Sequence, residues 1–474
     1  MTISLYSFLY AAIVYIVFYI VNKKARYVIL SLASICYIFL VSAYAGAIAL
    51  FLSLLAWLCG LWIQAGREKA GGKAALVISI IGSTAVLILF KYDVFRTILG
   101  PVHPLFNRLI MPIGISFYLF RVLSYVADIY EGKIEAEKNV LKLVLYLLWF
   151  PTFISGPIER MTSFQTQMEN LKRVRFLDWD RKIRSLRYIA IGVFYKLVLA
   201  DRLGLFVDTI YTHVSETSAF WLLTGAVFYS IQIYCDFAGY SFVATGISNL
   251  FGISIMENFD TPYLSENITE FWRRWHISLS IWLRDYIYIP LGGNRKGTFR
   301  KYLNIMMVFV VSGIWHGADI SFLVWGILHG LFSVLDGLLG NWKINFLRSG
   351  LLGRVLTFSA ATLAWIFFRA DTLPIALTYI QRMVTAGFSL SAIPAQFTEL
   401  GFEYIELIVL GIAFLAYLVF ELSGYCSKSS IPDCLGRTHY LVQYSVIFLL
   451  FAVTIVFGIY GMSFETSHLI YMQF

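Results

Sequence analysis

Apolar residues follow one another along this chain in runs that approach the length of a membrane-crossing helix. Residues 3–21 form the first run, and no charged residue interrupts residues 27–66. Because a crossing needs about 20 apolar residues, the second run predicts two helices joined near residues 42–46. Further runs of this kind cover residues 74–90, 217–235, 355–368, 407–420 and 440–464. Uninterrupted runs predict helices rather than the alternating strands of a barrel.

Two charged residues stand within an otherwise apolar stretch at residues 111–130. Arg121 interrupts the stretch and Asp128 follows about two helical turns later, so both side chains project from one face of the predicted helix. Charges at membrane depth usually partner one another or backbone carbonyls, which favours a structural pair turned to the interior of the helix bundle. A role for both residues along a substrate path is the alternative.

Residues 143–158 predict a crossing that is broken or re-entrant. The stretch contains Pro151 and Pro157 and leads into a basic loop that ends near Arg187. A complete crossing would place that loop outside, whereas basic loops tend to stay in the cytoplasm. A broken helix removes the conflict, and it is tolerated where the backbone packs against protein or lines a cavity. With partial crossings included, the pattern predicts about 11 transmembrane helices.

Composition and charge agree with this pattern. Apolar residues make up 59% of the chain and charged residues only 14%, so we predict an all-α polytopic membrane protein with additional re-entrant or interfacial helices. Nothing resembles a linker, and we expect a single membrane domain over residues 1–474. The net charge of +9 comes from basic residues in short loops, which indicates membrane topology rather than nucleic-acid binding. The five cysteines include no CxxC pair, so neither a disulfide framework nor a metal site is expected.

Candidate chemistry concentrates in residues 271–330, where His276 and His316 each follow a tryptophan. His316 ends an uncharged run that begins at Tyr302, and an ionisable side chain at such a depth marks a functional site by default. Histidine is a natural general base near neutral pH. The alternative for His316 is a hydrogen-bonded packing residue. For His276, which stands among arginines and tryptophans, the alternative is an anchor at the membrane interface.

Neighbouring side chains indicate where substrates would bind. Trp315 and Trp272 are candidates for the wall of an acyl pocket. A glycine-rich loop further on offers backbone N–H groups and cations that suit a phosphate-bearing donor, and its candidate binding residues are Asn294, Arg295 and Lys296. An ordinary basic loop on the cytoplasmic side is the alternative for it. The chain contains no HExxH, P-loop or GxSxG motif.

Six motifs between residues 111 and 371 carry a family resemblance. They are MPIGISFYLF, FPTFISGPIER, IQIYCDFAGYSFVATGI, ENFDTPYLSENITEFWRRWHISLSIWLRDYIYIPLGGNR, GIWHGA and AWIFFRAD. They resemble the membrane-bound O-acyltransferase superfamily, and within it the bacterial alginate O-acetylase branch, with peptidoglycan O-acetyltransferases and teichoic-acid D-alanyl transferases as relatives. The family's invariant histidine falls on His316. Its second catalytic position, Asn in many eukaryotic members and His in this branch, falls on His276.

The resemblance implies a fold and a direction of transfer. The family fold is a ring of tilted helices around a thinned centre, where a cytoplasmic funnel and an outer funnel meet near the catalytic histidine. An acyl thioester, either acetyl-coenzyme A or an acyl carrier protein, would enter from the cytoplasm as the donor substrate, and no bound cofactor is expected. The acceptor would lie outside the bacterial cytoplasmic membrane.

The same resemblance implies a partner and a product. Bacterial relatives commonly pass the acyl group to a separate extracytoplasmic esterase-like (SGNH-type) acyltransferase, so we expect such a partner beside membrane lipids. The expected outcome is O-acetylation of a cell-surface polysaccharide, either an alginate-like exopolysaccharide or peptidoglycan. D-alanyl transfer to teichoic acid from a carrier protein is the alternative. A polysaccharide or lipid transporter is the rival class, but it should show inverted repeats with paired broken helices. A membrane scaffold would give no reason for the Trp-His pairs.

The C-terminal tail, residues 465–474, supplies one further candidate. Its last six residues resemble the F-x-Y-x-x-F ending of this branch, with Leu469 in place of the first Phe. The phenol of Tyr471, with an ordinary pKa of about 10, is a reasonable acyl acceptor near a base such as His316, and this would make Tyr471 an acyl relay. The alternative is that Tyr471 only anchors the tail at the membrane interface.

Overall fold

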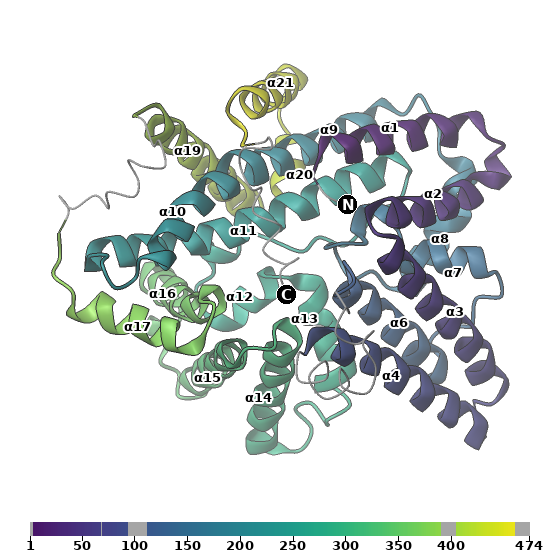
Figure 1. The fold of residues 1–474 in the computed structure, drawn as a ribbon, viewed down its shortest axis with the longest axis horizontal. Helices are drawn as coiled ribbons and strands as arrows, with labels where there is room; N and C mark the ends of the chain where they lie inside the picture. Colours follow the sequence, from purple (N-terminus) through teal and green to yellow (C-terminus); the bar gives the residue numbers. More distant parts are fainter. Residues whose placement is uncertain (1–2, 68, 93–110, 390–403, 460–474) are drawn as a thin grey trace. The chain divides into compact units, whose positions relative to one another are not determined.

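The computed structural model describes residues 3–67, 69–92, 111–389 and 404–459, which are helical with irregular connections (Figure 1). Within these residues, 7 helices are long and apolar enough to cross a membrane. They are Lys23–Val41, Ala43–Ala65, Ala70–Lys91, Ile320–Asn341, Gly350–Arg369, Ile405–Ser427 and Tyr440–Phe457. The protein is therefore an all-α, multi-pass membrane protein.

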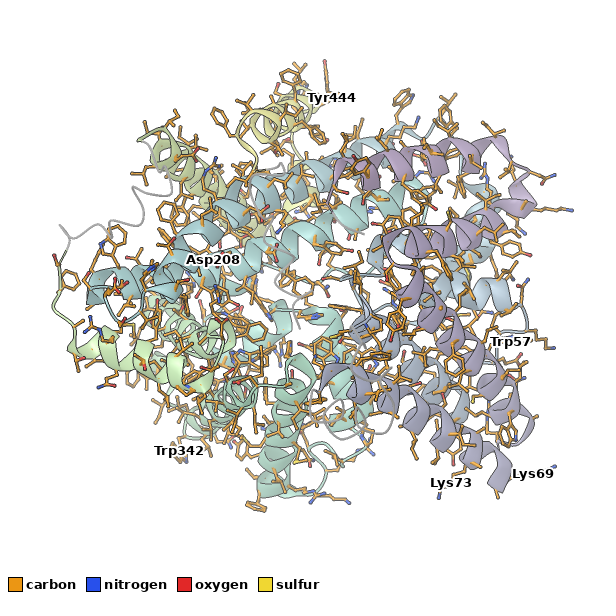
Figure 2. The ribbon with its side chains drawn as sticks, viewed as in Figure 1. Trp57, Lys69, Lys73, Asp208, Trp342 and Tyr444 are labelled. Carbon is orange, nitrogen blue, oxygen red and sulfur yellow. The ribbon has the colours of Figure 1, made fainter. Side chains whose placement is uncertain are left out.

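The backbone divides into two compact units, and the first comprises residues 1–189 and 241–257. It begins with α1 (Leu5–Ile20) and α2 (Arg26–Val41), followed by α3 (Ala43–Ala65), α4 (Ala70–Lys91) and α6 (Ile115–Tyr130). α3 packs against both α4 and α6, and Figure 2 shows Lys69 and Lys73 at the tip of the α3–α4 hairpin. α2 and α3 confirm the two helices that the uncharged run at residues 27–66 predicted, with the break at Ser42.

The predicted break within residues 143–158 is confirmed. α7 (Val140–Leu147) ends before a 3-10 turn at Phe150–Thr152, and α8 begins only at Met161 and ends at Asn170. The buried guanidinium of Arg121 donates to the Leu147 carbonyl at 3.3 Å and to the Thr152 hydroxyl at 2.7 Å. Arg121 thus satisfies backbone that the broken helix leaves without helical partners, which supports its structural reading. The Asp128 carboxylate lies 3.6 Å from the Lys133 ammonium.

The second unit comprises residues 190–240 and 258–474. α9 (Trp179–Val193) continues through a π-helical segment, Phe194–Ala200, into α10 (Asp201–Thr212). The long α11 (Ala219–Leu250) runs without interruption through Asp236, where the sequence predicted that a crossing ends. Lys196 explains the continuity, because its Nζ lies 2.6 Å from both Asp201 and Asp236 and its positive charge offsets part of the negative charge of this buried cluster.

The segment that holds the candidate chemistry folds as short helices and a hairpin. α12 (Ile268–Arg274) and α13 (Ile277–Leu283) lead through a π-helical turn to α14 (Gly297–His316) and α15 (Ile320–Asn341). α14 packs closely on α15, since a Cβ atom on Gly313 would lie 2.6 Å from the Phe322 carbonyl oxygen. α15 in turn packs on α16 (Gly350–Arg369), and α17 (Leu373–Thr385) follows in Figure 1.

The last described helices are α19 (Tyr404–Ser427), α20 (Ile431–Leu435) and α21 (Tyr440–Phe457). Glu421 of α19 is buried, and its carboxylate accepts hydrogen bonds from Tyr195 at 3.1 Å and from Tyr234 at 2.8 Å. These bonds fasten α19 to the π-helical segment and to α11. Helices that fall short of a full apolar span, such as α1 and the segment Val140–Thr152, account for part of the difference between the predicted crossings and the seven above.

Candidate active site

His276 occupies a constrained turn between α12 and α13. Its backbone is left-handed with φ of 42°, a conformation that a residue other than glycine rarely adopts. Asn258 holds this turn from two sides, since its carbonyl accepts from the Ile277 N–H at 2.9 Å and its side chain accepts from the Ser278 hydroxyl at 2.6 Å. A strained backbone that neighbouring groups hold in place is common at functional sites.

The His276 side chain is buried, with 1% of its surface exposed. Phe237 of α11 packs edge-on against the imidazole, with ring centroids 4.7 Å apart. The preceding Trp275 is also buried and contacts Trp365 of α16 at 4.9 Å. The structure therefore excludes the interpretation of His276 as an anchor at the protein surface.

His316 is the last residue of α14 and lies in an aromatic environment. Its Nδ1 is 2.7 Å from the carbonyl oxygen of Ser312, one helical turn earlier. Because a carbonyl only accepts, Nδ1 carries the proton and Nε2 is the basic nitrogen of the neutral ring. The imidazole contacts Trp325 at 4.7 Å and Phe368 at 5.4 Å between ring centroids. This is the tautomer that a general base requires at Nε2.

The two histidines belong to one buried site. Each is flanked by aromatic side chains, and these aromatic side chains contact one another. Trp365 connects the aromatic residues around His276 with those around His316, because it contacts Trp275 beside His276 and Phe368 beside His316. Aromatic walls of this kind exclude water, which strengthens the electrostatic interactions inside the site.

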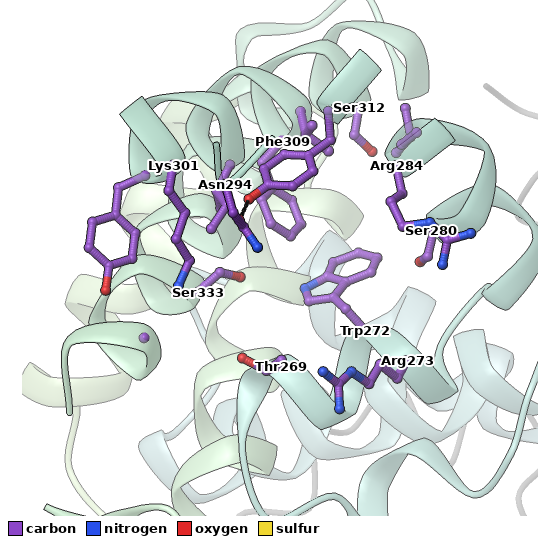
Figure 3. Close-up of a pocket in the computed structure, with 16 residues that line it drawn as sticks. Thr269, Trp272, Arg273, Ser280, Arg284, Asn294, Lys301, Phe309, Ser312 and Ser333 are labelled. Carbon is purple, nitrogen blue, oxygen red and sulfur yellow. Dashed lines mark hydrogen bonds between the residues drawn. The ribbon is translucent and has the colours of Figure 1, made fainter. Parts of the chain in front are cut away.

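A cavity of about 440 Å³ opens beside this site and is lined by α12, α13, α14 and α15 (Figure 3). Its lining includes Ser280 and Ser312. Ser280 lies one helical turn after His276, with its N–H donating to the His276 carbonyl, and Ser312 supplies the carbonyl that holds His316. The cavity therefore reaches both of the helical turns that carry the histidines.

Cations and polar groups line the rest of the cavity. Arg273, Arg284 and Lys301 contribute positive charge, and no acidic side chain belongs to the lining among the residues that the structure describes. Figure 3 shows Lys301 beside Asn294, whose side-chain oxygen accepts a hydrogen bond from Tyr288. A cavity with this lining suits a ligand with an anionic portion and an apolar portion.

The structure brings only some of the predicted site residues to the cavity. Trp272 and Asn294 line it. Trp315 packs against His316, with ring centroids 4.6 Å apart, and does not belong to the lining of the cavity. Arg295 and Lys296 are exposed on the loop before α14. Tyr471 lies outside the described residues.

Sequence reasoning missed several residues of this cavity. Arg273 and Arg284 were attributed to the membrane interface, because arginines among tryptophans are typical of that zone. Ser280 and Ser312 carried a usable signal, since each stands four positions from a candidate histidine and thus on the same helical face. Lys301 carried no such signal in the sequence, because this residue reaches the cavity only through the packing of α14 against α12 and α15. Among the described residues no cluster of His, Cys, Asp or Glu is arranged to hold a metal ion.

We expect His276→Ala to lower acyl transfer by up to about 10²-fold, because a buried polar group beside the base orients or polarises the substrate. His276→Asn is the matched comparison, since asparagine tolerates the left-handed backbone and keeps a hydrogen-bonding side chain. Its rate should lie between those of the wild type and His276→Ala. Initial rates with a labelled thioester would measure both variants, and an alanine variant within about twofold of the wild type would remove His276 from the mechanism.

Comparisons with known proteins identify the family of this chain. The model of the membrane-bound O-acyltransferase family, MBOAT, matches residues 134–369, which include both histidines. The chain is 35% identical over 398 residues to the probable alginate O-acetylase AlgI of Pseudomonas putida, covering 81% of this chain and 79% of that protein. It is 33% identical over 352 residues to the peptidoglycan O-acetyltransferase of Helicobacter pylori, covering 68% and 67%. The teichoic acid D-alanyltransferase of Bacillus subtilis is 28% identical over 306 residues, covering 62% and 77%.

Proposed function

Because the chain belongs to the membrane-bound O-acyltransferase family, we propose that it moves an acetyl or similar acyl group from a cytoplasmic thioester across the membrane. The acceptor in this proposal is a polysaccharide of the cell surface, either an alginate-like exopolysaccharide or peptidoglycan. One observation carries the proposal: a cavity lined by cations reaches the two helical turns that present His276 and His316. That geometry suits an anionic thioester whose reactive end lies beside a base.

His316 acts as the general base in the proposed reaction. Its Nε2 takes the proton from an acceptor hydroxyl, while the hydroxyl oxygen attacks the carbonyl carbon of the thioester. The C–S bond then breaks, and the departing thiolate takes the proton from His316, so no external proton is consumed. The Ser312 carbonyl holds the ring through Nδ1 and stabilises the positive charge that His316 carries between these steps. His276 would polarise the thioester carbonyl.

The cations of the cavity would hold the anionic portion of the donor. Arg273, Arg284 and Lys301 line the cavity and are partly open to solvent. A phosphate group would bind such a set through charge-assisted hydrogen bonds. Arg295 and Lys296 on the neighbouring loop would attract the donor as it approaches. Both acetyl-coenzyme A and an acyl carrier protein present a phosphate and a thioester, and both remain candidate donors.

The proposal includes the topology that this chemistry needs. A ring of about eleven transmembrane helices in the bacterial cytoplasmic membrane would enclose a cytoplasmic funnel and an outer funnel. An extracytoplasmic esterase-like acyltransferase would receive the acyl group and modify the polysaccharide. D-alanyl transfer from a carrier protein to teichoic acid is the second candidate function. The likeness to the Bacillus subtilis enzyme supports it, at a lower identity than the likeness to the O-acetylases.

We also propose that Tyr471 relays the acyl group to this partner. The phenol oxygen would form an ester with the acyl group, and that ester would be reactive toward the next nucleophile. Tyr471→Phe removes only the hydroxyl and keeps an aromatic anchor, so we expect acylation of the polymer to be lost. Acylated polymer can be measured in whole cells, with the amount of protein in the membrane as the control. Full acylation in the Tyr471→Phe strain would leave the residue as an anchor.

The experiment that tests the function uses the purified chain in lipid vesicles together with a thioester that carries a labelled acetyl group. We expect covalent acetylation of the chain or of an added acceptor and release of the free thiol. The same vesicles, filled with unlabelled buffer, also measure whether the chain transports a polysaccharide or a lipid into their interior. Uptake of an intact polysaccharide or lipid without acyl transfer would instead identify a transporter.

A further inference from the structure

His329 is a third histidine near the site that the proposed reaction does not use. It lies on α15, and its side chain has 0% of its surface exposed. Aromatic rings surround it on every side that the structure describes, with the nearest ring centroids at 4.9 Å for Trp272 and 5.1 Å for Trp325. Phe271 and Phe309 lie parallel or nearly parallel to the imidazole at 6.2 Å.

Neither ring nitrogen of His329 forms a hydrogen bond with the part of the chain that the structure describes. An unsatisfied buried polar group is costly, so the contacts of the ring with its aromatic neighbours must offset that cost. The imidazole plane meets the indole planes of Trp272 and Trp325 at 84° and 71°. Edge-to-face contacts of this kind are attractive, and they fix the orientation of both indoles.

The two indoles beside His329 face different parts of the site. Trp272, together with Phe309, lines the cavity, and the two rings are in contact at 5.1 Å between centroids (Figure 3). Trp325 contacts the imidazole of His316 at 4.7 Å. His329 therefore lies directly behind the aromatic wall of the cavity and braces it against the surroundings of the catalytic base.

The reactive end of a donor has to lie at this wall. The thioester carbonyl must approach the turns that carry His276 and His316, and the cavity reaches those turns at Ser280 and Ser312. Trp272 and Phe309 line the same cavity, and Figure 3 shows Trp272 between Ser280 and Ser333. The acyl chain beyond the carbonyl would therefore end against these aromatic rings.

We propose that His329 determines which acyl groups the enzyme accepts, by holding Trp272 and Phe309 in a wall that admits an acetyl group and excludes longer chains. The inference rests on the proposed function. His329 touches neither the substrate nor the reacting atoms, so it is a positioning residue that acts through Trp272. Its removal should open space behind the wall and leave His316 bound to the Ser312 carbonyl.

Competition between acyl donors tests this role. We expect His329→Ala to raise the rate with propionyl-coenzyme A relative to acetyl-coenzyme A by about tenfold, because one methylene in an apolar pocket typically changes selectivity by 10-fold or more. His329→Phe keeps a ring against both indoles, and its selectivity should stay within about twofold of the wild type. Leu222→Ala is the matched control, since Leu222 of α11 is also fully buried but does not line this cavity.

The outcomes distinguish the two proposals. Unchanged selectivity in an active His329→Ala variant would overturn the role of His329 and leave the proposed function intact. A shift of equal size in Leu222→Ala would also overturn it, because loosened packing anywhere would then suffice. No transfer from acetyl-, propionyl- or butyryl-coenzyme A by the wild type would overturn coenzyme A thioesters as donors, and the selectivity role with them. If His329→Ala does not fold, His329→Phe provides the test. Loss of selectivity in that variant would overturn the proposal that a ring at this position holds the wall in place.

Discussion

His316→Ala is expected to lower acyl transfer by about 10²- to 10⁴-fold and to leave a folded protein in the membrane. The change removes the Nε2 base and the bond from Nδ1 to the Ser312 carbonyl. In α14 a carbonyl accepts from the N–H four residues further on, so the Ser312 carbonyl keeps a helical partner when the imidazole is removed. The aromatic packing of Trp325 and Phe368 around the site should survive, since the imidazole contributes only one of their contacts.

The chain offers a matched control for this variant. His213 directly follows the last residue of α10, and its Nδ1 lies 3.0 Å from the carbonyl of Thr209, the same four-residue relation that His316 has with Ser312. His213→Ala therefore removes an equivalent local contact away from the candidate site. Transfer rates and elution as a single species in detergent should be compared for both variants. Near wild-type transfer by His316→Ala would remove this residue from the mechanism, and an equal loss in His213→Ala would attribute the effect to the helix end.

The membrane class and the broken segment could be predicted because they depend on local pattern. Runs of apolar residues predicted α3 and α4, and the stretch with Pro151 and Pro157 predicted the break that follows α7. The continuity of α11 could not be predicted in this way. Asp236 is acceptable inside that helix only because Lys196, from another helix, lies 2.6 Å away. Partners that are distant along the chain are invisible to hydropathy.

In the candidate site, too, residues with a local signal could be predicted, and residues that depend on distant parts of the chain could not. Depth within an apolar run and the family resemblance both pointed to His316, and the structure places its Nδ1 on a backbone carbonyl. The burial of His276 depends on Phe237 and Trp275 and could not be read from its arginine-rich surroundings. The cavity follows from the packing of four helices, so its lining comes from several positions along the chain, of which only Asn294 and Trp272 had been anticipated.

The buried cluster of Lys196, Asp201 and Asp236 supports the largest stability effect that we expect. Each carboxylate lies 2.6 Å from the Lys196 ammonium, and all three side chains are at most 9% exposed. Lys196→Met keeps a similar apolar volume but leaves two buried carboxylates without this cation. Removing one partner of a buried ion pair typically costs about 3–5 kcal/mol. We therefore expect Lys196→Met to lower the stability of the detergent-solubilised protein by at least that range, measured as a shift in its thermal unfolding.

Neutralising the carboxylates separates charge from packing. The triple variant Lys196→Met, Asp201→Asn, Asp236→Asn contains no buried charge in the cluster, and replacing a whole buried ion pair by neutral groups is often close to neutral in stability. This triple variant should recover most of the stability that Lys196→Met loses. Asp236 precedes Phe237, whose ring packs on His276 at 4.7 Å, so recovery of stability should be accompanied by recovery of acyl transfer. If the triple variant were as unstable as Lys196→Met alone, the cluster would matter for its shape and hydrogen bonds rather than for its charge.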